Sequence, residues 1–127
     1  MILMKRLGIF ASPLLVAALA ATGCSKSGSS PSALTAAELP ATVNSAFNKS
    51  SDQTKEVEAT FVADFQNQDP AAAFAQLQKL RAERDLTPQQ QGVVVRAWMT
   101  TMQQLQTAAQ NGNPSAQTAL HQYLSSR

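Results

Sequence analysis

The stretch TPQQQGVVVRAWMTTMQQLQTAAQ, residues 87–110, indicates the fold of this chain. It opens with a Thr, whose hydroxyl can accept a hydrogen bond from an unpaired backbone amide, and with a Pro, which has no amide to leave unpaired. Gln90 lies three residues after Thr87 and completes the pattern of a capping box. Apolar side chains then recur at helical spacing as far as Leu105. The stretch predicts one long helix over residues 88–110.

This helix is expected to be the central one. Apolar side chains cover about two thirds of its circumference, and a helix that is apolar on most sides packs against several neighbours. The polar remainder is a narrow strip of Arg96, Thr100, Gln103 and Thr107. The apolar side, expected to be core, consists of Val93, Val94, Val95, Ala97, Trp98, Met99, Met102 and Leu105.

The same start signal occurs at two other places, Asp69 with Pro70 and Asn113 with Pro114. Together these signals predict main helices over residues 52–67, 70–84, 88–110 and 114–125. A weaker helix precedes them, because Thr35 and Glu38 have the spacing of a capping box. Pro40 lies inside this segment, so we expect a kink or a later start.

Short connections make consecutive helices antiparallel neighbours, and Gly112 suits a left-handed cap at the end of the long helix. The sequence therefore predicts an all-α fold, a small antiparallel bundle of four or five helices over residues 35–127. Folding each hairpin about its turn predicts four contacts, which are Phe74 with Trp98, Leu77 with Val95, Leu105 with Leu120, and Met102 with Tyr123.

Residues 1–23 have the pattern of a cleaved signal peptide. Lys5 and Arg6 precede an uncharged, mostly apolar run over residues 7–21, which is shorter than the roughly 20 apolar residues that a membrane span needs. The stretch LAATGC, residues 19–24, resembles the lipobox of bacterial lipoproteins. The resemblance implies cleavage between Gly23 and Cys24 and attachment of lipid to the Cys24 thiol. The family more often has Leu where this chain has Ala21.

Cys24 is the only cysteine, so the alternatives are a free structural thiol or an intermolecular disulfide. Neither explains its place directly after the apolar run, and a lipidated thiol is chemically blocked. Residues 24–34 are expected to form a lipidated, flexible tether. Position 25 is Ser rather than Asp, which by resemblance to Gram-negative lipoproteins favours the outer membrane, facing the periplasm.

The net charge of the whole chain is +2, with ten basic and eight acidic residues. Because Lys5 and Arg6 belong to the signal peptide, the mature chain would balance eight basic against eight acidic residues. Nucleic-acid binding depends largely on neutralising phosphates, so this balance argues against it. The expected partners are instead the membrane, through the Cys24 lipid, and an envelope protein of unidentified kind.

Glu58 is a candidate for chemistry, because it falls inside an otherwise apolar arc of its helix. A buried carboxylate can be a catalytic acid or a proton-linked switch. The alternative, which we favour, is an ion pair across the hairpin with Arg81 or with Lys79. The sequence places no second carboxylate or histidine beside Glu58.

Val95, Met99 and Met102 are a second candidate, a soft apolar groove for a partner or a lipid. The alternative is that they are simply core. His121, the only histidine, has too few companions for a zinc site, and we expect no metal or other cofactor. Since no acid, base and nucleophile set is apparent, we expect a non-enzymatic binding or structural module of the cell envelope.

LTPQQ, residues 86–90, also matches the LTxxQ pattern of the periplasmic Spy and CpxP proteins, and LTAAE, residues 34–38, nearly matches it. The resemblance implies a chaperone or an envelope-stress protein, the alternative function. Both stretches are also explained as capping boxes. The second has Glu in place of Gln, and that family is typically soluble rather than lipidated.

Overall fold

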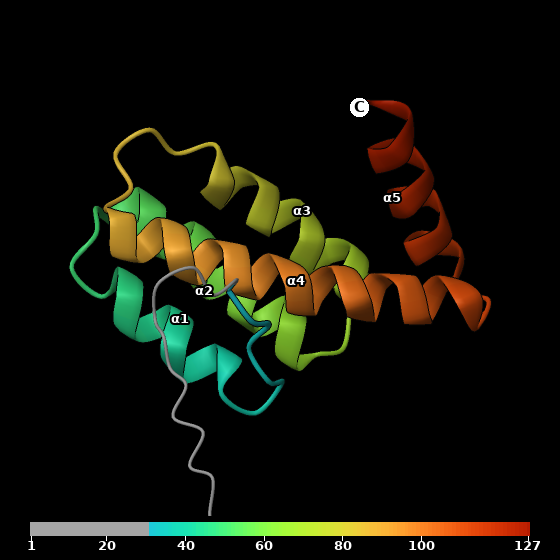
Figure 1. Ribbon diagram of the computed structural model, residues 1–127, viewed down its shortest axis with the longest axis horizontal. Helices are drawn as coiled ribbons and strands as arrows, with labels where there is room; N and C mark the ends of the chain where they lie inside the picture. The colour runs from blue at the N-terminus through green and yellow to red at the C-terminus, as the bar shows by residue number, and fades with distance from the viewer. Residues whose placement is uncertain (1–30) are drawn as a thin grey trace, which may run out of the picture.

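The computed structural model describes residues 31–127, and this part of the chain is all-helical (Figure 1). Its elements are α1 (Leu39–Phe47), α2 (Asp52–Gln66), α3 (Pro70–Arg81), α4 (Pro88–Gln110) and α5 (Pro114–Ser125). Helices adjacent in sequence pack together along α1–α2, α2–α3, α3–α4 and α4–α5, and α1 also packs on α4. The prediction of a small all-α bundle is confirmed.

The cap signals locate the helix starts well. The side chains of Asp69, Thr87 and Asn113 accept hydrogen bonds from the first turns of α3, α4 and α5. Thr35 and Glu38 form both hydrogen bonds of their capping box, and α1 then begins at Leu39 with Pro40 in its first turn, so the later start is correct.

Three boundaries differ from the sequence prediction, and the smallest difference is that α2 ends at Gln66 rather than at residue 67. α3 ends at Arg81 rather than at residue 84, because residues 82–87 are needed to turn the chain and to place Leu86 against the core. Leu34, assigned to the end of the tether, is only 2% exposed and belongs to the core. The ordered domain therefore begins before residue 35.

The core has two parts, joined at α4. The larger cluster lies among α1, α2, α3 and α4, and the smaller one is formed by Phe74, Leu105 and Ala116. Trp98 packs against both clusters, with its ring centroid 4.7 Å from that of Phe74 and 5.5 Å from that of Tyr123. The predicted contact of Phe74 with Trp98 is confirmed, and the other two predicted pairs at the α4–α5 hairpin share the smaller cluster.

The buried face of α4 is rotated from the predicted one. Thr100 and Thr101 are buried, whereas Val95 is 43% exposed and Met99 is 38% exposed. The expectation that Leu77 and Val95 meet in the core is wrong, because Leu77 is buried in the larger cluster whereas Val95 is exposed. Val94, Ala97, Thr101 and Leu105 define the inward face at spacings of three and four, and α4 has too many apolar residues for all of them to fit there.

Gln90 ties the start of α4 to the end of α1. Its side-chain oxygen accepts the Thr87 amide at 3.0 Å, which completes the capping box with the bond from the Gln90 amide to the Thr87 hydroxyl. Its amide nitrogen donates to the Ala46 carbonyl and to the Ser50 hydroxyl, each at 3.0 Å. Because the last carbonyls of a helix have no partner within it, Gln90 caps α1 as well as α4.

We expect Gln90→Glu to lower the free energy of unfolding by about 1–3 kcal/mol. A glutamate retains the acceptor for the Thr87 amide but cannot donate to Ala46 and Ser50. Chemical denaturation at neutral pH measures the change. Gln89→Glu, at the exposed neighbouring position, introduces the same charge into the first turn of α4 and serves as the control. Equal stability of the two variants would contradict the role of the donated bonds.

Candidate functional site

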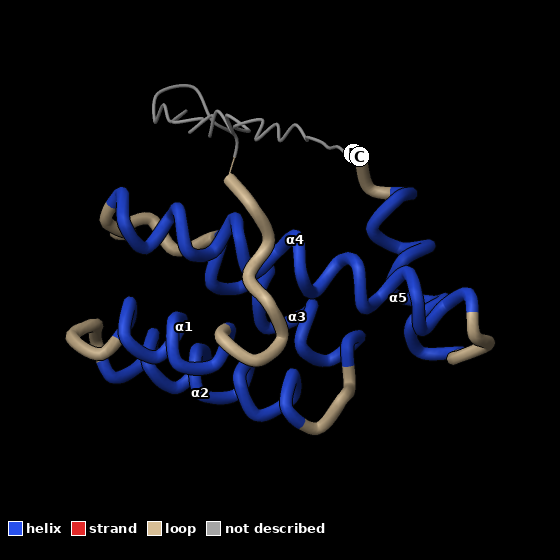
Figure 2. Tube along the Cα trace, turned by 60° about the horizontal axis from the view of Figure 1, so that its bottom comes forward, coloured by secondary structure: helices blue, strands red, loops and turns tan. Residues whose placement is uncertain are grey.

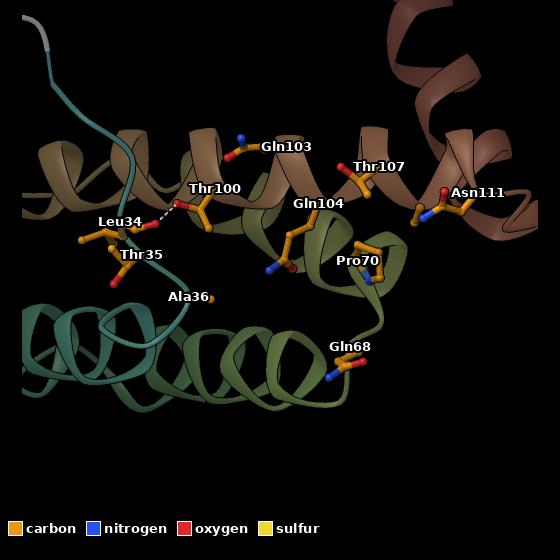
Figure 3. A pocket seen from close by; sticks show the side chains of 11 residues that line it. Leu34, Thr35, Ala36, Gln68, Pro70, Thr100, Gln103, Gln104, Thr107 and Asn111 are labelled. Atoms are coloured by element: carbon orange, nitrogen blue, oxygen red, sulfur yellow. Dashed lines mark hydrogen bonds between the residues drawn. The ribbon is translucent and has the colours of Figure 1, made fainter.

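A groove of about 590 Å³ runs along one side of α4 (Figure 3). One wall is the extended segment Leu34, Thr35 and Ala36, and the far end is the α2–α3 corner at Gln68 and Pro70. The remaining lining comes from successive turns of α4, namely Thr100, Gln103, Gln104, Thr107, Ala108 and Asn111. Segments far apart in the sequence thus meet at one site.

The lining of the groove is uncharged. Its polar groups are side-chain amides and hydroxyls, with Gln104 and Thr100 as examples, and its apolar parts come from Leu34, Ala36, Pro70 and Ala108. A side-chain amide donates hydrogen bonds through its nitrogen and accepts them through its oxygen. A hydroxyl also donates and accepts, both through its single oxygen. Such a surface suits a ligand that is itself uncharged and carries both donors and acceptors.

The extended wall is held to α4 by three hydrogen bonds. The Thr100 hydroxyl donates to the Leu34 carbonyl, the Leu34 amide donates to the Arg96 carbonyl at 3.5 Å, and Arg96 Nε donates to the Ser32 carbonyl at 2.9 Å. Together with the burial of Leu34, these bonds make residues 32–36 part of the folded domain. The groove therefore exists only because the chain crosses α4 before α1 begins.

Gln68, at the end of the groove, has an unusual backbone conformation. Its φ of 59° is the only positive φ of a non-glycine residue in the described part of the chain. The amides of Gln68 and Asp69 bond to the carbonyls of Phe65 and Asp64, which is the arrangement of a Schellman motif. Gly112 occupies the same position after α4, with φ of 93°, so its predicted role as a left-handed cap is confirmed.

The sequence does not predict this groove. Thr100, Gln103 and Thr107 were expected with Arg96 as a narrow polar strip of α4, and Thr100 is buried under the segment at Leu34. The available signal was the continuation of that strip through Gln104 and Asn111, at spacings of three and four over three turns. Nothing in the local sequence shows that residues 34–36 and 68–70 would close the other sides.

Glu58 is buried, as its place on the helix predicts, but its predicted ion pair is not formed. Glu58 is 5% exposed, and no salt bridge or hydrogen bond to its side chain is present among residues 31–127. The predicted partner Arg81 instead places its guanidinium carbon 4.1 Å from the centroid of the Trp98 ring. A cation over an aromatic face retains much of its hydration, whereas an ion pair in the core would desolvate both charges.

Burial raises the pKa of the Glu58 carboxyl above its usual value, because the charged form loses hydration. Thr101 is also buried, and its hydroxyl makes no hydrogen bond within the described residues. Neither residue lines the groove. We therefore interpret both as internal features of the core rather than as parts of a site.

Val95, Met99 and Met102 do not form a groove. Val95 and Met99 lie on the outer surface of α4, while Met102 is half-buried against the smaller cluster. The expectation that all three are core is wrong for Val95 and Met99. Gly23 and Cys24, the predicted cleavage and lipidation positions, lie outside the described residues.

The chain matches no protein family, no curated protein and no solved structure. Among residues 31–127, no helix has the length and apolar character needed to cross a membrane. In the same part of the chain, no three potential metal-ligating side chains gather at one place. The features that bear on function are therefore the groove, the exposed face of α4 and the sequence before residue 31.

We expect Gln68→Gly to raise the free energy of unfolding by up to about 1 kcal/mol, because glycine adopts a positive φ without steric cost. The matched control is Gly112→Ala. A Cβ at residue 112 would meet no atom within 4 Å, so backbone strain alone should destabilise that variant. Thermal denaturation of both variants measures the effects. If Gln68→Gly were instead less stable than the wild type, contacts of the Gln68 side chain would contribute more to the free energy of unfolding than relief of backbone strain does.

Glu58→Gln is expected to stabilise the protein at pH 7 and to have little effect near its usual pKa of 4.5 or below. Because folding raises this pKa, the native state binds the proton more tightly than the unfolded state. The stability that the protonated carboxyl contributes is therefore lost as the pH rises above the pKa that this carboxyl has in the unfolded state. Melting temperatures from pH 4 to pH 8 test this, with Glu56→Gln as an exposed control on the same helix. A variant less stable than the wild type at pH 7 would contradict the prediction.

Proposed function

We propose that this protein is a lipid-anchored component of the cell envelope that acts as a non-enzymatic binding module. The observation that carries the proposal is the sequence LAATGC at residues 19–24, directly after an uncharged apolar run. In a chain with one cysteine, that place gives the thiol a use as the attachment point of a lipid. Several acyl chains would hold the protein on a bilayer, since each buried CH₂ adds about 0.8 kcal/mol.

The groove along α4 is the proposed binding site. Its uncharged lining, with amides such as Gln103 and Gln104 above apolar side chains, would match an extended polypeptide segment, whose backbone alternates donors and acceptors. No titratable side chain lines the groove, so it offers neither a general acid nor a general base. The proposed ligand is therefore a segment of another envelope protein, which is bound without being chemically changed.

A chaperone or envelope-stress role of the LTxxQ kind is the second candidate. The observation that favours it is the tertiary role of Gln90 in LTPQQ, which goes beyond helix capping by joining α4 to α1. The other copy differs, because Glu38 makes only the local box with Thr35. A chaperone should suppress the aggregation of varied unfolded proteins in solution, whereas a dedicated partner should crosslink in native membranes as one stoichiometric species.

The anchor is tested with Cys24→Ser. A hydroxyl cannot form the thioether, so we expect the variant to remain an uncleaved precursor or to be cut elsewhere, while the wild type partitions into detergent. Intact mass of the wild type should show a lipidated cysteine as the first residue. Ser25→Ala keeps the thiol and should behave as the wild type. Wild-type protein in the aqueous phase with an unmodified Cys24 would overturn the anchor.

A further inference from the structure

The exposed apolar residues of α4 lie beside the point where the chain enters the folded domain. Val95 and Met99 are four residues apart and share one side of the helix. Arg96 precedes Met99 by three residues, so it borders the same side, and its Nε donates to the Ser32 carbonyl at 2.9 Å. Figures 2 and 3 show residues 31–34 crossing α4 toward the side away from α1 and α2.

α5 carries a third exposed apolar side chain. Leu124 is 54% exposed and lies two turns beyond Gln117, whose side chain donates to the Ala109 carbonyl of α4 at 3.0 Å. Helical spacing therefore places Leu124 on the Gln117 side of α5, away from the Gln122 side that faces α3. Val95, Met99 and Leu124 are the exposed large apolar side chains of the described domain, and we call them with Arg96 the α4–α5 face.

The charges of the domain are distributed unevenly about this face. Residues 86–127, which include α4 and α5, contain Arg96 and Arg127 but no Asp or Glu. Residues 52–85, which include α2 and α3, contain seven acidic and four basic side chains, and the acids lie in α2 and in the loops rather than in α3. Arg96 is the basic side chain of the α4–α5 face, and an anionic surface close to it would be attracted by about 1 kcal/mol.

From this arrangement we propose that the α4–α5 face rests on the anionic lipid surface of the leaflet that holds the Cys24 lipid. The proposal rests on the lipid anchor proposed above. Ser32 is eight positions after Cys24, so the anchor point and the entry point of the chain can be at most about 29 Å apart. Since Ser32 is held by Arg96, which borders this face, the short connection keeps the face close to the bilayer. Apolar side chains of an interfacial helix then enter the headgroup region, and the arginine contacts the phosphates.

The orientation has a consequence for the groove. With the α4–α5 face toward the lipid, α1 and α2 would lie on the far side of the domain, and the groove would open along the flank between them (Figures 2 and 3). A ligand segment would then enter parallel to the membrane surface. The exposed acidic side chains of α2 would face the aqueous compartment.

The test uses the lipidated protein reconstituted into vesicles. Met99→Cys is labelled with an environment-sensitive fluorophore, and Ala63→Cys, exposed on α2, carries the same label as the control. The Cys24 thiol is blocked by its lipid, so each variant has one reactive site. In vesicles of phosphatidylcholine with about a third phosphatidylglycerol, we expect iodide to quench residue 99 roughly threefold less than residue 63. Nitroxide-bearing lipids should quench residue 99 only.

Val95→Asp, combined with the label at residue 99, should abolish the difference without releasing the protein from the vesicles. Equal iodide quenching at residues 99 and 63 in a vesicle-bound wild type would overturn this inference and leave the anchor intact. Protection of residue 99 without nitroxide quenching would show a protein occupant, such as a second copy of the chain, and would also overturn it. Protein that does not enter the vesicles and carries a free Cys24 would refute the anchor itself.

Discussion

The packing of α4 against four partners is the constraint on which the rest of the structure depends. α1, α3, α5 and the extended segment ending at Leu34 all lie against this helix. Trp98 is its pivotal side chain, because its ring contacts both apolar clusters and also lies under the Arg81 guanidinium. A single helix with so many neighbours must orient each side chain for a different contact. The groove and the α4–α5 face lie on the sides of α4 that the neighbouring elements do not cover.

Buried polar side chains lower the stability that this packing provides. The Thr101 hydroxyl is buried without a hydrogen-bond partner, and Glu58 is 5% exposed on the core side of α2 without an ionic partner. Both positions would suit a hydrophobic side chain. An unpaired buried polar group commonly costs about 1–3 kcal/mol. The domain tolerates these costs because α2, α3 and α4 bury a continuous cluster of Phe and Leu side chains around them.

The two surfaces of α4 differ in ways that match different uses. The groove is polar without charge, and its walls are fixed by hydrogen bonds of the Thr100 hydroxyl and of Arg96 to the crossing segment. The α4–α5 face is apolar with a positive border and is open to its surroundings. A protein held at a membrane would use the second surface for its own orientation and leave the first available to a ligand. Both proposals therefore draw on the same helix, and Arg96 takes part in both, since it borders the α4–α5 face and also holds the segment that forms the groove wall.

The sequence by itself determined the helices. Proline with a capping residue fixes a helix start through local hydrogen bonds, and short connections fix the neighbours, so element order and hairpin pairing could be read in advance. The rotation of α4 could not be read from the sequence, because Val95 and Thr100 differ little in helical preference. Thr100 is buried because the segment at Leu34 crosses α4 over it, whereas Val95 remains 43% exposed. The predicted ion pair of Glu58 is absent for a related reason. The tertiary structure places the Trp98 ring within reach of Arg81, and the guanidinium lies over that ring instead of pairing with Glu58. The sequence alone does not show which of the two contacts forms. The groove likewise needed residues 34–36 and 68–70 to meet across the chain, a contact that has no local signature in the sequence.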